Sequence, residues 1–349
     1  MSTPSKPSKP ASRRTLAIDD YQREHRVLGF PIAVIYKFFD DSGAYLAALM
    51  TYYAFVSLFP LLLLLSTVLS ILLRNNPDLQ RHIVESAASQ FPVVGQQLKN
   101  PKSLSGGVSG VLAGVAFATY GGLGVGQAVQ YAMNTAWAVP RNSRPNPIFA
   151  RFRSLLLVGC AALVLLTTTV VSALGGFLPG DTAQVMAWFI PVVIVVVNAL
   201  IFIGIYRHGS SRKLSPLQVL PGSILAALAW ALLQTYGFKY VAHVIRRAGA
   251  TDASGTNLIF ATVLGLLAFI YLASIITVFC VEVNVVLDKK LYPRALLTPF
   301  TDNVVLTSGD RRTYTAIAQA NRHKGFERID VSFDERPPAE RERDRSDDN

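Results

Sequence analysis

The chain has 349 residues, of which 51% are hydrophobic and only 16% are charged, and its formal net charge is +11. A soluble protein of this length spreads its charges along the chain, whereas here they gather at the two ends and the middle is almost free of them. This distribution excludes an ordinary soluble domain and predicts an all-α membrane protein. We attribute the positive charge to membrane topology and expect no nucleic-acid partner.

The sequence lacks the short motifs of the common enzyme classes. It has no GxxxxGK[ST] phosphate loop, no HExxH zinc motif and no GxSxG nucleophile elbow. The two cysteines, Cys160 and Cys280, lie in apolar runs and are expected to pack there rather than to form a disulfide or bind a metal. We therefore expect no enzyme activity, no cofactor, no metal and no ATP-driven motor.

The N-terminal 43 residues are expected to form a cytoplasmic tail, disordered over residues 1–20. From Val27 to Asp40 the apolar positions recur at helical spacing, which predicts a short helix lying at the membrane surface. The first apolar run is about 30 residues long, too long for the apolar core of a secretion signal, so we expect an uncleaved anchor.

Six apolar runs predict six membrane-spanning helices, since each is long enough to cross a bilayer. The expected spans are residues 44–73, 108–136, 155–178, 185–206, 217–240 and 258–287. An amphipathic connector is expected at 78–102 and a basic loop at 141–153. Pro60 predicts a kink in the first span, because proline removes a backbone hydrogen bond. Residues 288–349 are expected to form a cytoplasmic tail, partly disordered, with a helix at about 310–323 capped by Ser308.

Lys and Arg set the expected orientation. The loops after the second and fourth spans carry basic residues and no acidic ones, namely Arg141, Arg144, Arg151, Arg153, Arg207, Arg212 and Lys213. Cytoplasmic loops of membrane proteins are enriched in Lys and Arg. We therefore expect these loops and both termini in the cytoplasm.

The second span carries a small residue at every fourth position. Such a row lets the helix backbone approach a neighbouring helix closely, which is a main packing device inside lipid. The predicted helix-packing glycines are Gly106, Gly110, Gly114, Gly122 and Gly126. We expect this span to be the central packing helix of the bundle, and the alternative is an ordinary glycine-rich membrane helix.

Polar side chains inside the spans lie in the half predicted to face the cytoplasm. Lipid makes such groups costly, so they are candidates for function. The candidate cavity-lining residues are Glu282, Asn284, Gln127, Gln130, Asn134, Asn198, Tyr52, Tyr53 and Ser57. We predict a cavity open to the cytoplasm in which Glu282 binds a cation, a head group or a proton. The alternative is a structural cluster in which Glu282 pairs with a nearby Arg or Lys.

Three stretches resemble the YihY/BrkB family, whose members were formerly called ribonuclease BN. The first span has Tyr53-Ala54 followed by Ser57-Leu58-Phe59-Pro60-Leu61, and the second ends in AMNTAW, with Asn134 and Trp137 at the family's positions. The sixth span ends in VFCVEVNVVL, which is similar to the family's pattern of Glu and then Asn. The similarity covers about residues 30–290, and Val281 and Val283 stand where family members often have small residues.

The resemblance implies a bacterial inner-membrane protein linked to envelope integrity and, by proposal, to lipid transport. Our first functional hypothesis is a transporter or flippase-like carrier of a lipid or other amphiphile, with membrane lipids as its partners. The competing hypothesis is a scaffold that does not transport and uses the glycine row to contact a second copy or an envelope protein. Nuclease activity is not expected, because Glu282 is the one charge embedded in a span, and metal-dependent hydrolysis needs clustered carboxylates or histidines.

Overall fold

The computed structural model describes residues 13–72, 107–175, 180–237, 239–240, 243, 247, 256–300, 304–334 and 336. Every regular element among these residues is a helix, and none of them is in a strand. The predicted connector at 78–102, Gly106 and the last thirteen residues lie outside this described part. The chain is therefore all-helical throughout the described part.

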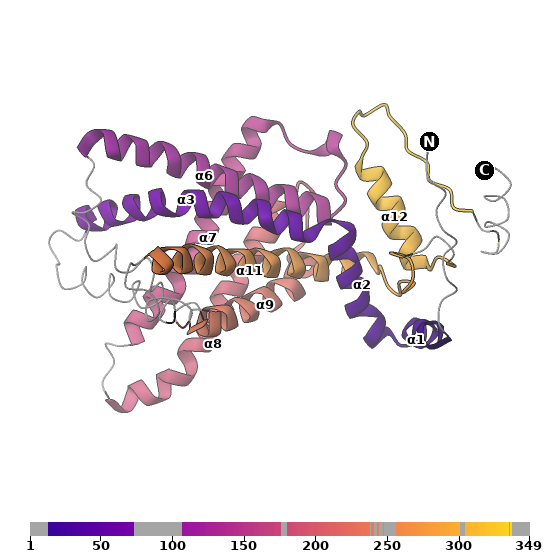
Figure 1. Cartoon of the computed structure of the whole chain (residues 1–349), viewed down its shortest axis with the longest axis horizontal. Coiled ribbons are helices and arrows are strands. Elements are labelled where there is room, and N and C mark those ends of the chain that lie inside the picture. The colour runs from indigo at the N-terminus through magenta and orange to yellow at the C-terminus, as the bar shows by residue number, and fades with distance from the viewer. Residues whose placement is uncertain are drawn as a thin grey trace. The chain divides into compact units, whose positions relative to one another are not determined.

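Six long helices follow the apolar runs of the sequence (Figure 1). They are α3 (Gly43–Leu72), α6 (Gly107–Ala136), α7 (Pro147–Gly175), α8 (Gly180–Gly209), α9 (Pro216–Leu232), which continues as a π-helical turn (Leu233–Gly237), and α11 (Thr256–Lys289). The described residues contain four stretches long and apolar enough to cross a membrane: Pro147–Val164, Phe189–Gly209, Pro216–Gly237 and Val263–Lys289. The chain is thus a multi-pass membrane protein.

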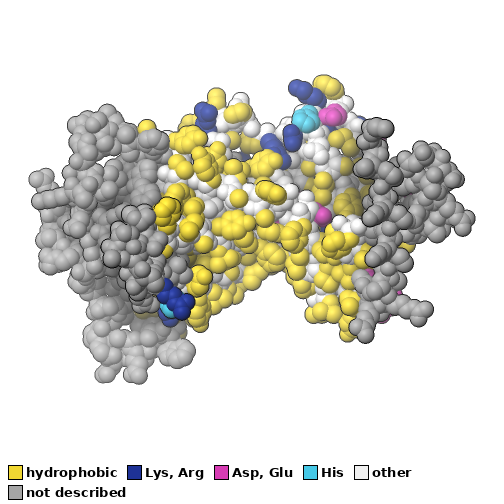
Figure 2. Space-filling model, in the orientation of Figure 1, with side chains coloured by type: hydrophobic (Ala, Val, Ile, Leu, Met, Phe, Trp, Pro, Cys, Tyr) yellow, Lys and Arg dark blue, Asp and Glu magenta, His cyan; other side chains and the backbone are white. Residues whose placement is uncertain are grey.

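The outer surface of these helices is apolar. On the face shown in Figure 2, hydrophobic side chains make up most of the described surface. Large apolar residues such as Leu163 on α7, Phe189 and Leu200 on α8 and Leu264 on α11 are more than half exposed. A helix surface of this kind is stable in lipid and would be a strong aggregation site in water.

The chain divides into two compact units. The span unit comprises residues 42–134 and 145–281, and the terminal unit comprises residues 1–41, 135–144 and 282–349. Each unit is built from segments that are far apart in the sequence. The helix α11 runs through the boundary, so its last turns, from Glu282 onward, belong to the terminal unit.

Within the span unit, α6 packs tightly against α3 and α7 through glycines. A Cβ atom added at Gly121 would lie 2.5 Å from the Cβ of Ser57 on α3, and one at Gly126 would lie 2.5 Å from the Cα of Ser154 on α7. A Cβ at Gly124 would overlap the ring of Tyr53. The contact with α3 therefore runs through Gly121 and Gly124, which are not in the predicted row.

Several predicted boundaries differ from those of the structure. Helix α7 begins at Pro147, so Arg151 and Arg153 are helical rather than in a loop. The helix starts there because proline suits the first helical position. In addition, the Asn146 side chain accepts a hydrogen bond from the N–H of Ile148. Part of the expected disordered segment forms helix α1 (Arg13–Glu24). Its Asp19 forms an ion pair with Arg23 at 2.7 Å.

The helix of the C-terminal tail also starts about two residues earlier than expected. Helix α12 (Ser308–Ala320) is capped by Thr307 rather than by Ser308. Thr307 and Asp310 form a capping box, in which each side chain accepts from the other residue's backbone N–H. The tail is therefore ordered around this helix.

Candidate functional site

Helix α2 (Arg26–Asp40), in the terminal unit, is apolar on two faces. One face is buried and includes Ala33, Val34 and Phe38. Lys37 lies on the same face, one helical turn after Ala33 and Val34, and is only 2% exposed. The opposite face, with Ile35 and Phe39, is exposed. A lysine on the buried side of such a helix needs a charged partner, because an unpaired buried ammonium is very costly.

Lys37 has two carboxyl partners, and all three side chains are buried. Its Nζ forms an ion pair and hydrogen bond with Oδ2 of Asp41, four residues later at the end of α2. The same Nζ lies 3.7 Å from Oε2 of Glu282 on α11. Asp41 is 7% exposed and Glu282 is 0% exposed. We call Lys37, Asp41 and Glu282 the buried triad; it lies entirely within the terminal unit.

Burial and charge act against each other in the triad. Burial lowers the pKa of the Lys37 ammonium, but Glu282 and Asp41 raise it and prevail, so Lys37 is charged at neutral pH. Burial raises the pKa of the Asp41 carboxyl above its ordinary value, although Lys37 beside it lowers it. The triad is therefore a place where a carboxyl group holds its proton more tightly than it does in water.

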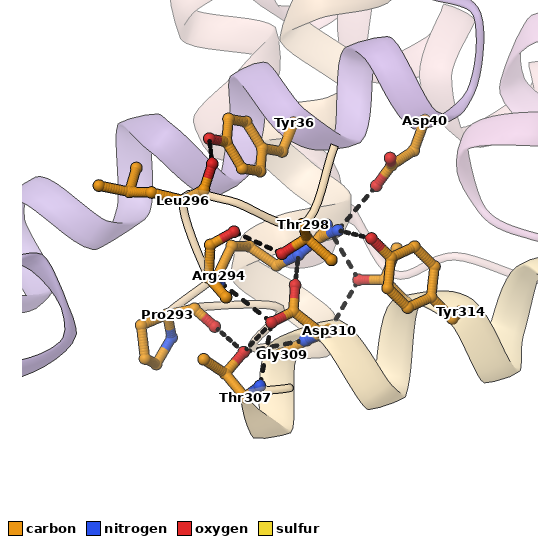
Figure 3. Close-up of polar contacts among 12 residues, drawn as sticks. Tyr36, Asp40, Pro293, Arg294, Leu296, Thr298, Thr307, Gly309, Asp310 and Tyr314 are labelled. Atoms are coloured by element: carbon orange, nitrogen blue, oxygen red, sulfur yellow. Dashed lines mark hydrogen bonds and ion pairs between the residues drawn. The ribbon is translucent and has the colours of Figure 1, made fainter. Parts of the chain in front are cut away.

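A second buried ionic cluster, in the same unit, holds the C-terminal tail (Figure 3). Arg294 is fully buried after the end of α11. Its Nε donates to Oδ1 of Asp310 at 2.5 Å, and its Nη2 donates to Oδ2 of Asp40 at 2.9 Å. Burial lowers the pKa of Arg294, while Asp40 and Asp310 raise it and prevail. The guanidinium thus joins α2 to α12, and we call this cluster the tail clamp.

Asp310 connects the clamp to the start of α12. Its Oδ2 accepts from the backbone N–H of Ala295 at 3.0 Å and from that of Thr307 at 3.0 Å. The next residue back, Gly309, packs so closely that an added Cβ would overlap the carbonyl oxygen of Pro293 and lie 2.7 Å from that of Leu291. Figure 3 shows Asp310 between Arg294 and Thr307. The same carboxylate therefore caps the helix and fixes it to the chain that follows α11.

Two of the predicted cavity-lining residues hold loops and helices together in the span unit. Gln130 donates to the carbonyl oxygen of Ala150 at 2.8 Å and to Oγ of Ser154 at 2.9 Å, both on α7. The Oδ1 atom of Asn134 accepts from the N–H of Ser211 at 2.7 Å, which fixes the loop between α8 and α9. Both side chains are buried and their contacts are with protein.

The other predicted lining residues of the span unit have varied surroundings. Ser57 is buried against Gly121, Tyr53 packs on Gly124, and Tyr52 and Gln127 are exposed. Asn198 on α8 is fully buried, and its amide has no hydrogen-bond partner among the described residues. Glu282 and the also buried Asn284 belong to the terminal unit.

The structure gives the contacts of two predicted packing glycines and the backbone of two others and of the predicted kink. Gly126 contacts α7, whereas the nearest atom to a Cβ at Gly122 would be 3.9 Å away, on Val158. Gly110 and Gly114 lie in the described backbone of α6, and α3 continues as helix through Pro60 to Leu72.

The sequence identifies Glu282 and offers pairing with a nearby Arg or Lys as one alternative, but it does not name Lys37 or Asp41 as the partners. Lys37 was assigned to a surface helix, although its spacing from Ala33 and Val34 places it on an apolar face and is a usable signal. Arg294 and Asp310 gave no comparable signal, because they lie in the tail after the last span, where charged residues are common.

In the part of the chain that the structure describes, no group of three or more His, Cys, Asp or Glu side chains is placed to hold a metal ion.

A family model described as Virulence factor BrkB matches residues 34–302. The chain belongs to the BrkB family. This confirms the resemblance noted in the sequence. The matched region contains the whole buried triad and Arg294, and it ends before Thr307 and Asp310 of the tail clamp.

Two relatives are similar to this BrkB-family chain over most of their length. An uncharacterised protein of Dickeya dadantii (strain 3937) is 26% identical over 296 residues, covering 76% of this chain and 87% of its own. YfkH of Bacillus subtilis (strain 168), which is named as ribonuclease-like, is 24% identical over 260 residues, covering 70% of this chain and 90% of its own. No solved structure matches the chain.

Proposed function

We propose that this BrkB-family protein is a carrier of a lipid or other amphiphile in the bacterial inner membrane and that it contributes to envelope integrity. The observation that carries the proposal is the buried triad, in which α11, a candidate membrane span, presents Glu282 to Lys37 and Asp41. Buried ion pairs add little net stability compared with apolar packing. Charged groups in membrane segments are rare and costly, and they mark ion pathways, substrate pathways and proton relays.

The proposal includes six spans with both termini in the cytoplasm. Helices α3 and α6 each have 30 residues and contain no charged residue, which is long enough to cross a bilayer in addition to the four stretches described above. The basic residues after α6 and after α8, such as Arg141 and Arg212, favour the cytoplasmic side for those loops. The exposed apolar face of α2 supports a helix that lies at the cytoplasmic membrane surface.

The proposal does not include an enzymatic activity. Nuclease chemistry needs metal ligands or an acid and a base placed around the scissile phosphate. Within the spans the embedded charge is Glu282, and it is engaged with Lys37. The ribonuclease-like name of YfkH is therefore not carried over to this chain. Purified protein that hydrolysed RNA, and lost that activity when its own carboxylates were changed, would contradict this part of the proposal.

A scaffold is the competing function. It would use the glycines of α6 to bind a second copy or an envelope protein. At the C-terminal half of α6, however, Gly121, Gly124 and Gly126 pack against α3 and α7 of the same chain. This leaves Gly110 and Gly114, in the N-terminal half, as the positions where a scaffold would bind its partner.

The experiment compares transport by variants of the triad and of the glycine row. Purified protein is reconstituted into liposomes containing fluorescent phosphatidylethanolamine or phosphatidylglycerol, and movement between leaflets is followed by quenching from outside. A carrier loses most of this movement in Glu282→Gln and keeps it in Asp288→Asn, a matched change near the end of the same helix. A protein that moves neither probe, and whose oligomer is lost in Gly114→Leu, is a scaffold instead.

A further inference from the structure

The buried triad has an uneven number of charges. It contains one ammonium, on Lys37, and two carboxyl groups, on Asp41 and Glu282. If both carboxyl groups were ionised, the triad would carry one uncompensated negative charge in a region that excludes water. A buried charge without a counterion is strongly unfavourable, and proteins avoid it by taking up a proton.

The neighbouring charges do not supply the missing positive charge. Among the described residues, the groups that act electrostatically on the triad are its own members and Asp40, which precedes Asp41 on α2. Asp40 is itself negative, and its carboxylate is bound to Arg294 in the tail clamp. On α11, the polar neighbour of Glu282 is Asn284, which carries no charge. The triad therefore has to balance its charge internally.

The oxygens of Glu282 give an independent observation. Both are fully buried, and neither accepts a hydrogen bond from an ordinary N–H or O–H donor among the described residues, whereas the carboxyl group of Asp41 lies within hydrogen-bonding reach of Glu282. The nearest cation is Lys37 Nζ, 3.7 Å from Oε2, which is an ion-pair distance but is too long for a strong hydrogen bond. A buried carboxylate normally accepts several hydrogen bonds, whereas a carboxyl group that carries or shares a proton needs fewer.

We infer that Lys37, Asp41 and Glu282 form a site that binds one proton, shared between the carboxyl groups of Asp41 and Glu282. With one proton the triad is neutral, having one ammonium, one carboxylate and one carboxylic acid. The raised pKa of Asp41 agrees with this state. The proton belongs to the pair rather than to either residue, because two carboxyl groups beside the same cation titrate together.

Proton binding by the triad goes beyond the proposed carrier function and does not depend on it. A further step does rest on the proposed function: the bound proton is the coupling ion for transport. The triad is closed to solvent in this structure, so the proton leaves only in a conformation that admits water to Glu282. Release would leave the negative charge unbalanced, and that charge favours either rebinding or a compensating movement of a substrate cation.

Infrared spectroscopy of the purified protein tests the inference directly. A protonated carboxylic acid has a C=O stretching band that a carboxylate lacks and that shifts in heavy water. We expect the wild type to show this band at neutral pH, and we expect Glu282→Gln and Asp41→Asn each to lose it completely. Each variant leaves Lys37 with a single carboxylate. That ion pair is already neutral and needs no proton. The control Asp330→Asn, at an exposed carboxylate paired with Arg328, keeps the band.

The intensity of the band distinguishes one bound proton from none or two. Lys37→Met should show about twice the wild-type band, because both carboxyl groups then need a proton. A wild type without the band, or single variants that keep half of it, would overturn the inference. If Lys37→Met does not fold, the two carboxyl variants still decide. If the protein moves lipid but lacks the band, the proposed carrier function stands and the proton site is wrong. If the protein has the band but moves no lipid, the proton site stands and the carrier function is wrong.

Discussion

Asp40 and Asp41 are consecutive residues at the end of α2, and their carboxylates bind two different buried cations. Asp40 binds Arg294 of the tail clamp at 2.9 Å, whereas Asp41 binds Lys37 of the buried triad. One turn of helix therefore holds both the C-terminal segment and the ion cluster that we assign to function. Changes at these two neighbouring positions should have different effects, which makes them useful as controls for each other.

Asp41→Asn should weaken the pH dependence of stability. The raised pKa of Asp41 means that the folded protein binds this proton more tightly than the unfolded chain does. This contribution to stability is complete below the ordinary Asp pKa of about 3.9 and is lost as the pH rises through the raised value. Thermal unfolding in detergent at a series of pH values should show Tm falling over that interval in the wild type and less so in the variant. An equally steep profile in Asp41→Asn would contradict the assignment.

Lys37→Met should be strongly destabilising. Removing one partner of a buried ionic cluster leaves the other charges uncompensated and typically costs about 3–5 kcal/mol. Thermal unfolding of the purified variant measures this loss, and the exposed Lys213→Met is the control, with no expected change. Adding Glu282→Gln to Lys37→Met should restore much of the lost stability, because it removes a carboxyl group that no longer has a cation. A double variant as unstable as the sum of its single changes would show that charge balance is not the cause.

Gly309→Ala should loosen α12, because the added methyl group overlaps the carbonyl oxygens of Pro293 and Leu291. Overpacking of this kind typically costs about 1–3 kcal/mol. The readout is hydrogen exchange of the amides of α12, which should accelerate. Gly325→Ala is the matched control, since a Cβ there meets no atom within 4 Å. Unchanged exchange in Gly309→Ala would mean that α12 is not held by this contact.

Gly121→Ala and Gly122→Ala should differ sharply although the two residues are adjacent. A Cβ at Gly121 lies 2.5 Å from Ser57 on α3, whereas one at Gly122 has its nearest neighbour at 3.9 Å. We expect Gly121→Ala to lower the Tm of the purified protein by several degrees and Gly122→Ala to leave it nearly unchanged. The opposite order would indicate that the predicted row at every fourth residue, rather than Gly121, forms the contact with α3.

The helices could be predicted because lipid imposes a simple requirement. A run of 30 residues without a charge, such as α3 or α6, has few alternatives to a helix, because in lipid the backbone must satisfy its own hydrogen bonds. The contact faces could not be predicted in the same way. The row at every fourth residue winds around α6 and indicates no single contact face. Gly121 and Gly124, outside the row, meet α3 because the position of the neighbouring helix determines which glycine is approached.

The candidate site was predictable only where a residue conflicted with its surroundings. Glu282 was identified because a carboxylate in an apolar run is costly wherever that run lies. Its partner Lys37 belongs to a helix near the other end of the chain, and no local pattern indicates such a pairing. The link between Asp40 and Arg294, which are 254 residues apart, is equally invisible in the sequence. Asn142 and Arg322, whose side chains hydrogen-bond at 3.3 Å, are a third example.

The composition of the terminal unit determines when it can be completed during biosynthesis. It combines segments from the beginning, the middle and the end of the chain, and the side chain of Gln22 donates to the carbonyl oxygen of Arg294 at 2.5 Å. A ribosome produces α2 long before it produces Arg294, so Asp40 stays without this cation until the last membrane helix has left the ribosome. Closure of this unit therefore follows insertion of the whole bundle. A chain that ends before Arg294 leaves Asp40 without this cation and the Gln22 side chain without this acceptor.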